Sequence, residues 1–330
     1  MFVNVYKISF IFIILINIFP YILTSEGDRS PFYQNSVKSC LKANCTDGGR
    51  SFTPSAAKQL EISSRLLWNC RDECRYHSMW RTVQGFQERG YQTPKFHGKW
   101  PFKRILGVQE PASAFASFLN LAAHVYMHVE MTRQFPVDST PIVLFWHFFA
   151  AVCMNAWIWS IIFHTRDNPF TEFMDYACAL SMVMILYAAA VVRVFHKRRK
   201  TVAVILVLSV LYYVEHVQYL YSESVDYEYN MMVNIFFGVV GSLIWLTWAC
   251  VQCLGGRGYA WRVVAFVALS GAALALELLD FPPLYHAWDA HALWHLTTAP
   301  LVPLFYRFVI DDLKYTQKAQ RSEKSDYKLT

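Results

Sequence analysis

The sequence predicts an all-α membrane protein with seven transmembrane helices, preceded by a signal peptide and a cysteine-rich lumenal segment. Of its 330 residues, 55% are hydrophobic and only 16% are charged, whereas soluble domains carry about 25% charged residues. From residue 112 onward, apolar runs recur that are long enough to cross roughly 30 Å of hydrocarbon as helices. Four cysteines gather in the polar stretch before these runs.

The first 25 residues predict a secretory signal peptide. Lys7 is the only charged residue before the apolar stretch ISFIFIILINIFPYIL, and the polar residues TSEGDRS follow it. A short apolar region with a polar exit is typical of a cleaved signal. Pro20, Thr24 and Ser25 suit the end of such a signal. A retained signal anchor is the alternative interpretation.

Residues 26–111 form the predicted lumenal segment, which contains Cys40, Cys45, Cys70 and Cys74. Because export leads to an oxidising compartment, we expect these cysteines to form two disulfides, and the sequence leaves all three pairings open. A zinc site is the alternative, since Cys70 and Cys74 are four residues apart. Asn44 opens the sequon N-C-T and is a glycosylation candidate if the segment is lumenal.

Seven apolar runs predict the membrane-spanning helices, and only short connections separate them. The runs cover residues 112–131, 142–164, 174–195, 201–220, 230–253, 261–279 and 291–311. We expect them to form one domain over residues 112–313, followed by a tail at 314–330.

Positive charge in the connections predicts the orientation of the domain. The connection HKRRK at 196–200 lies on the same side as Arg133, Arg257 and Arg262, whereas the connections on the other side are rich in acids. The basic side is therefore expected in the cytosol. An odd number of spans then puts the cysteine-rich segment in the lumen, as the signal peptide also predicts, and the C-terminal tail in the cytosol.

Reactive side chains gather at the lumenal ends of three predicted spans. Ser160 and His164 are four residues apart at the end of the second span, so they share a helix face. Asp175 opens the third span, and His291 and His295 repeat the four-residue spacing at the start of the seventh. Because ionisable residues inside a membrane are costly, this common depth predicts one functional site.

Three histidines in that site predict a metal centre. Zinc held by His164, His291 and His295 would leave a fourth position for water, which is the arrangement of catalytic zinc sites. Asp175 is then expected to take or relay a proton. Ser160 is expected to hydrogen-bond the water or the developing oxyanion. The alternative makes Ser160 a nucleophile with His164 as its base.

Other polar residues of the spans predict supporting roles. His124 and His128 have the same spacing as the metal candidates, but they lie about 18 Å or more from the lumenal end of their helix, at 1.5 Å per residue. We expect them to make interhelical hydrogen bonds. Glu277 and Asp280 are candidate partners of metal-bound imidazoles. Asp289 fits that role too, or caps the seventh helix.

Three sequence blocks resemble the Per1-like family: FHGKWPFKRILGVQEPASAFASFLNLAAH, WNCRDECRYHSMW and DAHALWHLTTAP. The resemblance implies membership of a wider superfamily that includes the alkaline ceramidases and the progestin and adiponectin receptors. Its pattern is Ser-x-x-x-His, then Asp, then His-x-x-x-His. The pattern matches Ser160, His164, Asp175, His291 and His295, and the resemblance implies that the histidines bind zinc.

The resemblance also implies a function. It indicates a metal-dependent lipid ester hydrolase of the phospholipase A2 type that removes the unsaturated sn-2 acyl chain from GPI-anchored proteins. Its partners are then GPI-anchored proteins and membrane lipid, without nucleic acid. The family implies a Golgi membrane location, with the endoplasmic reticulum as the alternative. The competing hypotheses are a seven-span receptor-like or lipid-binding protein without hydrolytic activity, and a transporter.

Overall fold

The computed structural model describes residues 25–59, 61, 67–222 and 226–326. Two compact units divide the chain, Met1–Pro101 and Phe102–Thr330. All of the expected signal peptide except Ser25 lies outside the described residues. Residues 102–111, which were expected to close the cysteine-rich segment, belong to the second unit.

The first unit is a small helical body. Its elements are α2 (Glu26–Arg29), α3 (Pro31–Asn44), β1 (Cys45–Thr46), η1 (Asp47–Gly49), β2 (Ser51–Phe52), α4 (Pro54–Gln59) and α6 (Cys70–Glu88). Helix α3 packs against α6, with Tyr33, Val83 and Phe96 buried between them and the following loop. Asn69 caps α6 by accepting a hydrogen bond from the backbone N–H of Asp72. A core this small needs covalent support.

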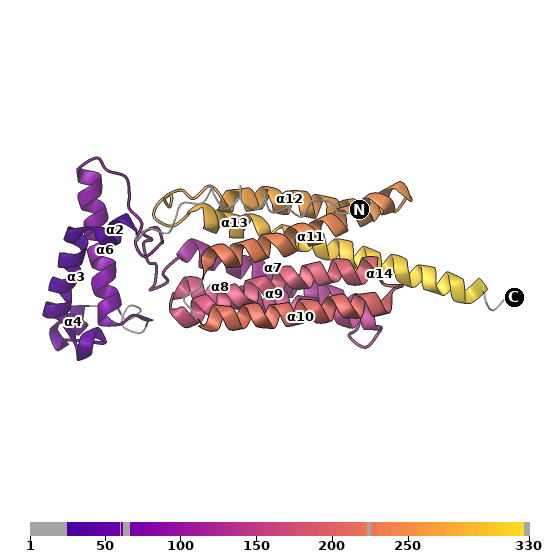
Figure 1. Cartoon of the computed structure of the whole chain (residues 1–330), viewed down its shortest axis with the longest axis horizontal. Helices are drawn as coiled ribbons and strands as arrows, with labels where there is room; N and C mark the ends of the chain where they lie inside the picture. Colours follow the sequence, from indigo (N-terminus) through magenta and orange to yellow (C-terminus); the bar gives the residue numbers. More distant parts are fainter. Residues whose placement is uncertain (1–24, 60, 62–66, 223–225, 327–330) are drawn as a thin grey trace, which may run out of the picture. The chain divides into compact units, whose positions relative to one another are not determined.

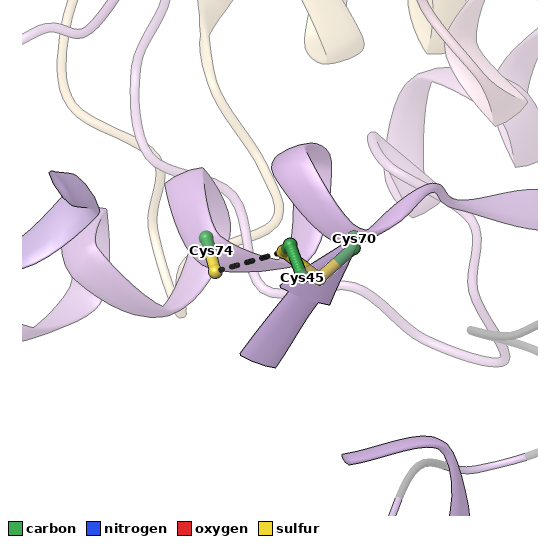
Figure 2. Close-up of side chains that lie close together, drawn as sticks. All are labelled: Cys45, Cys70 and Cys74. Atoms are coloured by element: carbon green, nitrogen blue, oxygen red, sulfur yellow. Dashed lines mark hydrogen bonds between the residues drawn. A yellow bond between two sulfur atoms is a disulfide. The ribbon is translucent and has the colours of Figure 1, made fainter. Parts of the chain in front are cut away.

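Two disulfides supply that support. Cys40 pairs with Cys74, and Cys45 pairs with Cys70, so the end of α3 and β1 are tied to the first turns of α6. The bridges are neighbours, because Sγ of Cys45 lies 3.8 Å from Sγ of Cys74 (Figure 2). The prediction of two disulfides is confirmed. The alternative of a zinc site on these cysteines is wrong, because all four sulfurs are engaged in disulfide bonds.

The second unit is a bundle of long helices that run alongside one another (Figure 1). They are α7 (Pro111–Gln134), α8 (Pro141–Thr165), α9 (Pro169–Val194), α10 (Arg199–Ser222), α11 (Tyr227–Leu254), η2 (Gly258–Ala260), α12 (Trp261–Glu277), α13 (Ala290–Thr298) and α14 (Leu301–Asp326). Proline opens α7, α8 and α9, where its fixed φ suits the first turn. Asn168 and Thr171 add a capping box to α9.

Of the described helices, five are long and apolar enough to cross a membrane: α8, α9, α10, α11 and the continuous stretch Gly258–Glu277. They match the second to sixth expected spans, so the membrane character of the chain is confirmed. Helix α7 and the pair α13–α14 occupy the expected first and seventh spans but are not among the five. The seven-span count therefore stays a prediction.

The two exceptions have physical reasons. Helix α7 buries a polar face inside the bundle, with Ser113, Ser117 and Asn120 fully shielded from solvent, which lowers its overall hydropathy. The expected seventh span is interrupted at residues 299–300 between α13 and α14. Pro300 has no backbone N–H to continue α13, so the helix ends there and restarts at Leu301.

Histidines in the far half of α7 make interhelical hydrogen bonds, as predicted. Nδ1 of His124 lies 3.1 Å from the hydroxyl of Tyr306 on α14. Nε2 of His128 lies 2.9 Å from Nδ1 of His147 on α8, and Nε2 of His147 bonds the backbone carbonyl of Phe135 at 3.1 Å. These imidazoles hold α7 against α8 and α14.

A buried ion pair joins α9 to α14. Arg193 donates to both carboxylate oxygens of Asp312, at 2.5 and 2.8 Å. The hydroxyl of Tyr259 also donates to Asp312, at 2.8 Å, and the Arg193 guanidinium stacks 4.9 Å from the ring centre of Trp248. Because breaking a buried pair leaves an uncompensated charge, this cluster specifies the packing of four helical elements, α9, α11, η2 and α14.

The disulfide pairing predicts a defined peptide map. Trypsin cleaves after Lys42, Arg50, Arg65 and Arg71, and so places the four cysteines in four different peptides. Without reduction, we expect the peptide SCLK linked to DECR, and ANCTDGGR linked to LLWNCR, in a mass spectrum. Prior enzymatic deglycosylation, which leaves Asp at a glycosylated Asn, reports on Asn44 in the same spectrum. A link between SCLK and LLWNCR would contradict the structure.

Candidate metal centre

Three imidazoles converge at one end of the second unit. His164 lies in the last turn of α8, and His291 and His295 lie one turn apart on α13. Each residue offers a nitrogen that lies within 4.8 Å of those of the other two. The ring centre of His164 is 5.2 Å from each of the other two rings, which are 4.4 Å apart. The structure thus brings together the three histidines that the sequence predicted as one group.

Two of these imidazoles are held by carboxylates. Nδ1 of His164 lies 2.7 Å from Oε2 of Glu110, and both side chains are almost fully buried. Nδ1 of His291 lies 2.8 Å from Oε2 of Glu277, the last residue of α12. Since an ionised carboxylate only accepts hydrogen bonds, each Nδ1 carries the proton. The lone pair of each ring then resides on Nε2, which is the arrangement of histidines that bind metals.

The ring nitrogens that do not bond a carboxylate indicate whether the three histidines could bind a metal cation. Among the described residues, neither Nε2 of His164 nor Nδ1 of His295 has a hydrogen-bond partner, although both are buried. Nε2 of His295 lies 2.9 Å from Nε2 of His291. Buried lone pairs without donors are costly. A zinc ion would accept these two lone pairs together with that of Nε2 of His291, so the donor set fits it.

Two side chains of α7 contact α8 and α13, the helices that carry the three histidines. Oγ of Ser160 lies one turn before His164 on α8 and is 3.0 Å from Oγ of Ser117, with both hydroxyls buried. Asn120 donates to the backbone carbonyl of His295 at 2.7 Å. Helix α7 therefore reaches both α8 and α13 through polar contacts.

The other predicted site residues have different surroundings. Asp175 lies in the second turn of α9 rather than its first, because α9 begins at Pro169, and it is partly buried. The carboxylates bound to the histidines are Glu110 and Glu277, so a place for Asp175 in the site stays a prediction. Asp280 is exposed in the loop after α12.

Of the two roles considered for Asp289, the structure provides the helix cap. Its Oδ1 accepts a hydrogen bond from the backbone N–H of Ala292 at 2.8 Å and so starts α13. The cap stabilises the first turn of the helix that carries His291 and His295. Of the three predicted partners of imidazole, Glu277 makes the expected contact.

Comparison with known proteins gives the family. The model of the Per1-like family matches residues 62–313. The chain belongs to this family. It is 43% identical to "Post-GPI attachment to proteins factor 3" of Drosophila melanogaster, over 87% of this chain and 89% of that protein. It is 41% identical to "GPI-specific phospholipase A2-like PGAP3" of Homo sapiens, over 89% of this chain and 91% of that protein. No solved structure matches the chain.

Three residues at the centre of this Per1-like protein were missed by reasoning from its sequence. They are Glu110, Ser117 and Asn120, which contact His164, Ser160 and His295. Ser113, Ser117, Asn120 and His124 recur at spacings of four, three and four, which marks one polar face of a helix. That periodicity was available in the sequence, but it does not say which helix the face meets.

The contact between Glu110 and His164 predicts an effect on metal binding. Glu110→Gln keeps the shape of the side chain but removes the charge that orients the imidazole. We expect metal affinity to fall by about 10- to 100-fold, the usual cost of losing such a partner. Metal retained after dialysis against a competing chelator measures this effect.

Glu130→Gln is the matched control for this variant, because Glu130 lies in α7, the helix that Glu110 directly precedes, and its carboxylate makes polar contacts with Gln134 and Arg133. Equal metal retention in the Glu110 and Glu130 variants would show that Glu110 does not orient His164.

Proposed function

We propose that this protein hydrolyses the unsaturated sn-2 acyl ester in the lipid of GPI-anchored proteins, a reaction of the phospholipase A2 type. The observation that carries the proposal is the convergence of His164, His291 and His295, with two of them held by carboxylates. The names of the relatives, at 40–43% identity, supply the GPI-linked substrate class. The helices that are long and apolar enough to cross a membrane would place the protein in the bilayer that contains a lipid substrate.

In this proposal, His164, His291 and His295 hold a zinc ion. Zinc with three protein ligands activates water for attack on an ester carbonyl near neutral pH. Glu110 and Glu277 keep the proton on Nδ1 of their imidazoles, so that each Nε2 lone pair is available. The buried position of His164 and His295 excludes bulk water, which strengthens the electrostatic interactions in the site.

Ser160 and Asp175 complete the proposed chemistry. The hydroxyl of Ser160, oriented by Ser117, donates a hydrogen bond to the developing oxyanion or to the attacking water. The contacts favour this role over a nucleophile, because Nδ1 of His164 bonds Glu110 and its Nε2 has no partner in the described part of the chain. Asp175 would take the proton that the water releases and return it to the glycerol oxygen when the acyl ester bond breaks.

The proposed setting is the lumenal leaflet of the Golgi membrane, with the endoplasmic reticulum as the alternative. The two disulfides support an oxidising compartment for the first unit. The Ser-x-x-x-His, Asp and His-x-x-x-His pattern supports the wider relationship to alkaline ceramidases and to the progestin and adiponectin receptors. GPI-anchored proteins and membrane lipid are the proposed partners.

The first test compares the wild-type protein with His295→Ala on a purified GPI-anchored protein in detergent. We expect wild type to release one unsaturated fatty acid, which mass spectrometry detects, and to hold about one zinc ion per chain. His295→Ala should lose both properties, because it removes one of three ligands. No release by a folded, zinc-loaded wild type would favour the alternative of a receptor-like or lipid-binding protein.

A second variant separates proton transfer from metal binding. Asp175→Asn keeps the size of the side chain, so we expect the protein to fold and to retain its metal. Turnover should fall by about 10²- to 10⁴-fold, the usual contribution of a positioned acid or base. Acyl release and zinc content measured on the same preparation test this, and full activity would remove Asp175 from the mechanism.

A further inference from the structure

A tight turn before α7 exposes a large apolar side chain. Ile105 and Val108 bridge each other across Leu106 and Gly107, whose φ angles are +51° and +81°. Two-residue turns with two positive φ angles favour Asn-Gly, because Asn tolerates the left-handed region and Leu does not. Leu106 is nonetheless 82% exposed. Leu106 therefore has an unfavourable backbone conformation, and burial of its side chain in the protein does not explain why a leucine stands there.

The loop between α12 and α13 repeats this feature. Leu284 and Trp288 bridge across a turn in which Tyr285 and His286 have φ angles of +54° and +59°. Tyr285 is 93% exposed and Leu284 is 54% exposed. Strained residues of this kind persist mainly at functional positions.

Both turns are attached to the histidine centre. Leu106 is four residues before Glu110, whose backbone N–H bonds the carbonyl of His164 at 2.9 Å. Tyr285 is six residues before His291. The two segments are also joined to each other, because the backbone N–H of Lys103 bonds the carbonyl of His286 at 2.9 Å.

The exposed apolar surface of these turns continues that of a membrane helix. Leu278 and Leu279 follow α12 directly, and each is 62% exposed. Beyond the exposed Asp280, exposed apolar residues resume at Leu284 and Tyr285 in the same loop. Because the stretch that ends at Glu277 is apolar enough to cross a membrane, lipid is the covering that fits the exposed apolar residues next to it. Tyrosine suits the boundary between hydrocarbon and water.

We propose that Leu106 and Tyr285 form a lipid-contacting rim beside the histidine centre. The rim inserts into the membrane leaflet at this end of the bundle and guides the acyl chain of a lipid substrate toward the histidines. Lipid contact by the rim rests on the exposure of its residues, the turn geometry and the adjoining apolar helix, and not on enzymatic activity. The guidance of substrate rests on the proposed function.

The first experiment measures depth and needs no enzymatic activity. A nitroxide is attached to Leu106→Cys or Tyr285→Cys of the full chain, with Cys250 and Cys253 replaced by Ser because they are exposed and free. In phosphatidylcholine bilayers, we expect both labels to collide more with oxygen than with a water-soluble nickel chelate.

Ser139→Cys, in the exposed turn between α7 and α8, is the control and should show the opposite preference. Labels at 106 and 285 that behave like the label at 139 would overturn the rim.

The second experiment uses Leu106→Asn and Tyr285→Asn. Asparagine is better suited to a positive φ, so the melting temperature should stay the same or rise. For a substrate in bilayers, we expect KM to rise about tenfold, the effect of losing much of one buried apolar side chain, with kcat little changed.

Hydrolysis of a short-chain substrate in solution should be unaffected by both substitutions. An unchanged KM in bilayers would overturn substrate guidance. Absence of hydrolysis by wild type would count against the proposed function and leave the depth result standing.

Discussion

The organisation of the bundle depends on the cost of burying polar groups in an apolar setting. Hydrocarbon offers no water to an unpaired donor or acceptor, so buried polar side chains are stabilised by partners within the protein, often on another helix. Glu110 pairs with His164, and Glu277 pairs with His291. These two contacts specify how the start of α7, the end of α8, the end of α12 and the start of α13 meet. The position of the histidine centre follows from them.

Helix α7 extends the same principle along its length. Its polar face contacts α8 through Ser117, α13 through Asn120 and α14 through His124. Beyond this face, the pair between Arg193 and Asp312 joins α9 to α14. The bundle is therefore held by polar contacts at several levels, while apolar packing fills the space between them. Such contacts keep the helices from shifting along one another, which holds the three imidazoles in fixed relative positions.

Much of the architecture was predictable from the sequence because it depends on local properties. Run lengths predicted α8 to α12 within a few residues, and the cysteines in a polar segment predicted two disulfides. The spacing of His291 and His295 predicted a shared helix face. Their position at the same end of the predicted spans as His164 predicted that the three histidines lie close together. The sequence analysis did not predict the break at Pro300 or the weaker apolar character of α7, because hydropathy is averaged over a helix and does not say which face is buried.

By itself, the sequence determined the family, the helical class, and the three histidines as a group, since these follow from motifs and periodicity. Only the tertiary structure decided the pairing Cys40–Cys74 and Cys45–Cys70, because pairing depends on how α3 lies against α6. It also decided that Glu110 orients His164, a contact across 54 residues of chain. Periodicity says which residues share a helix face, whereas only packing brings one face to another.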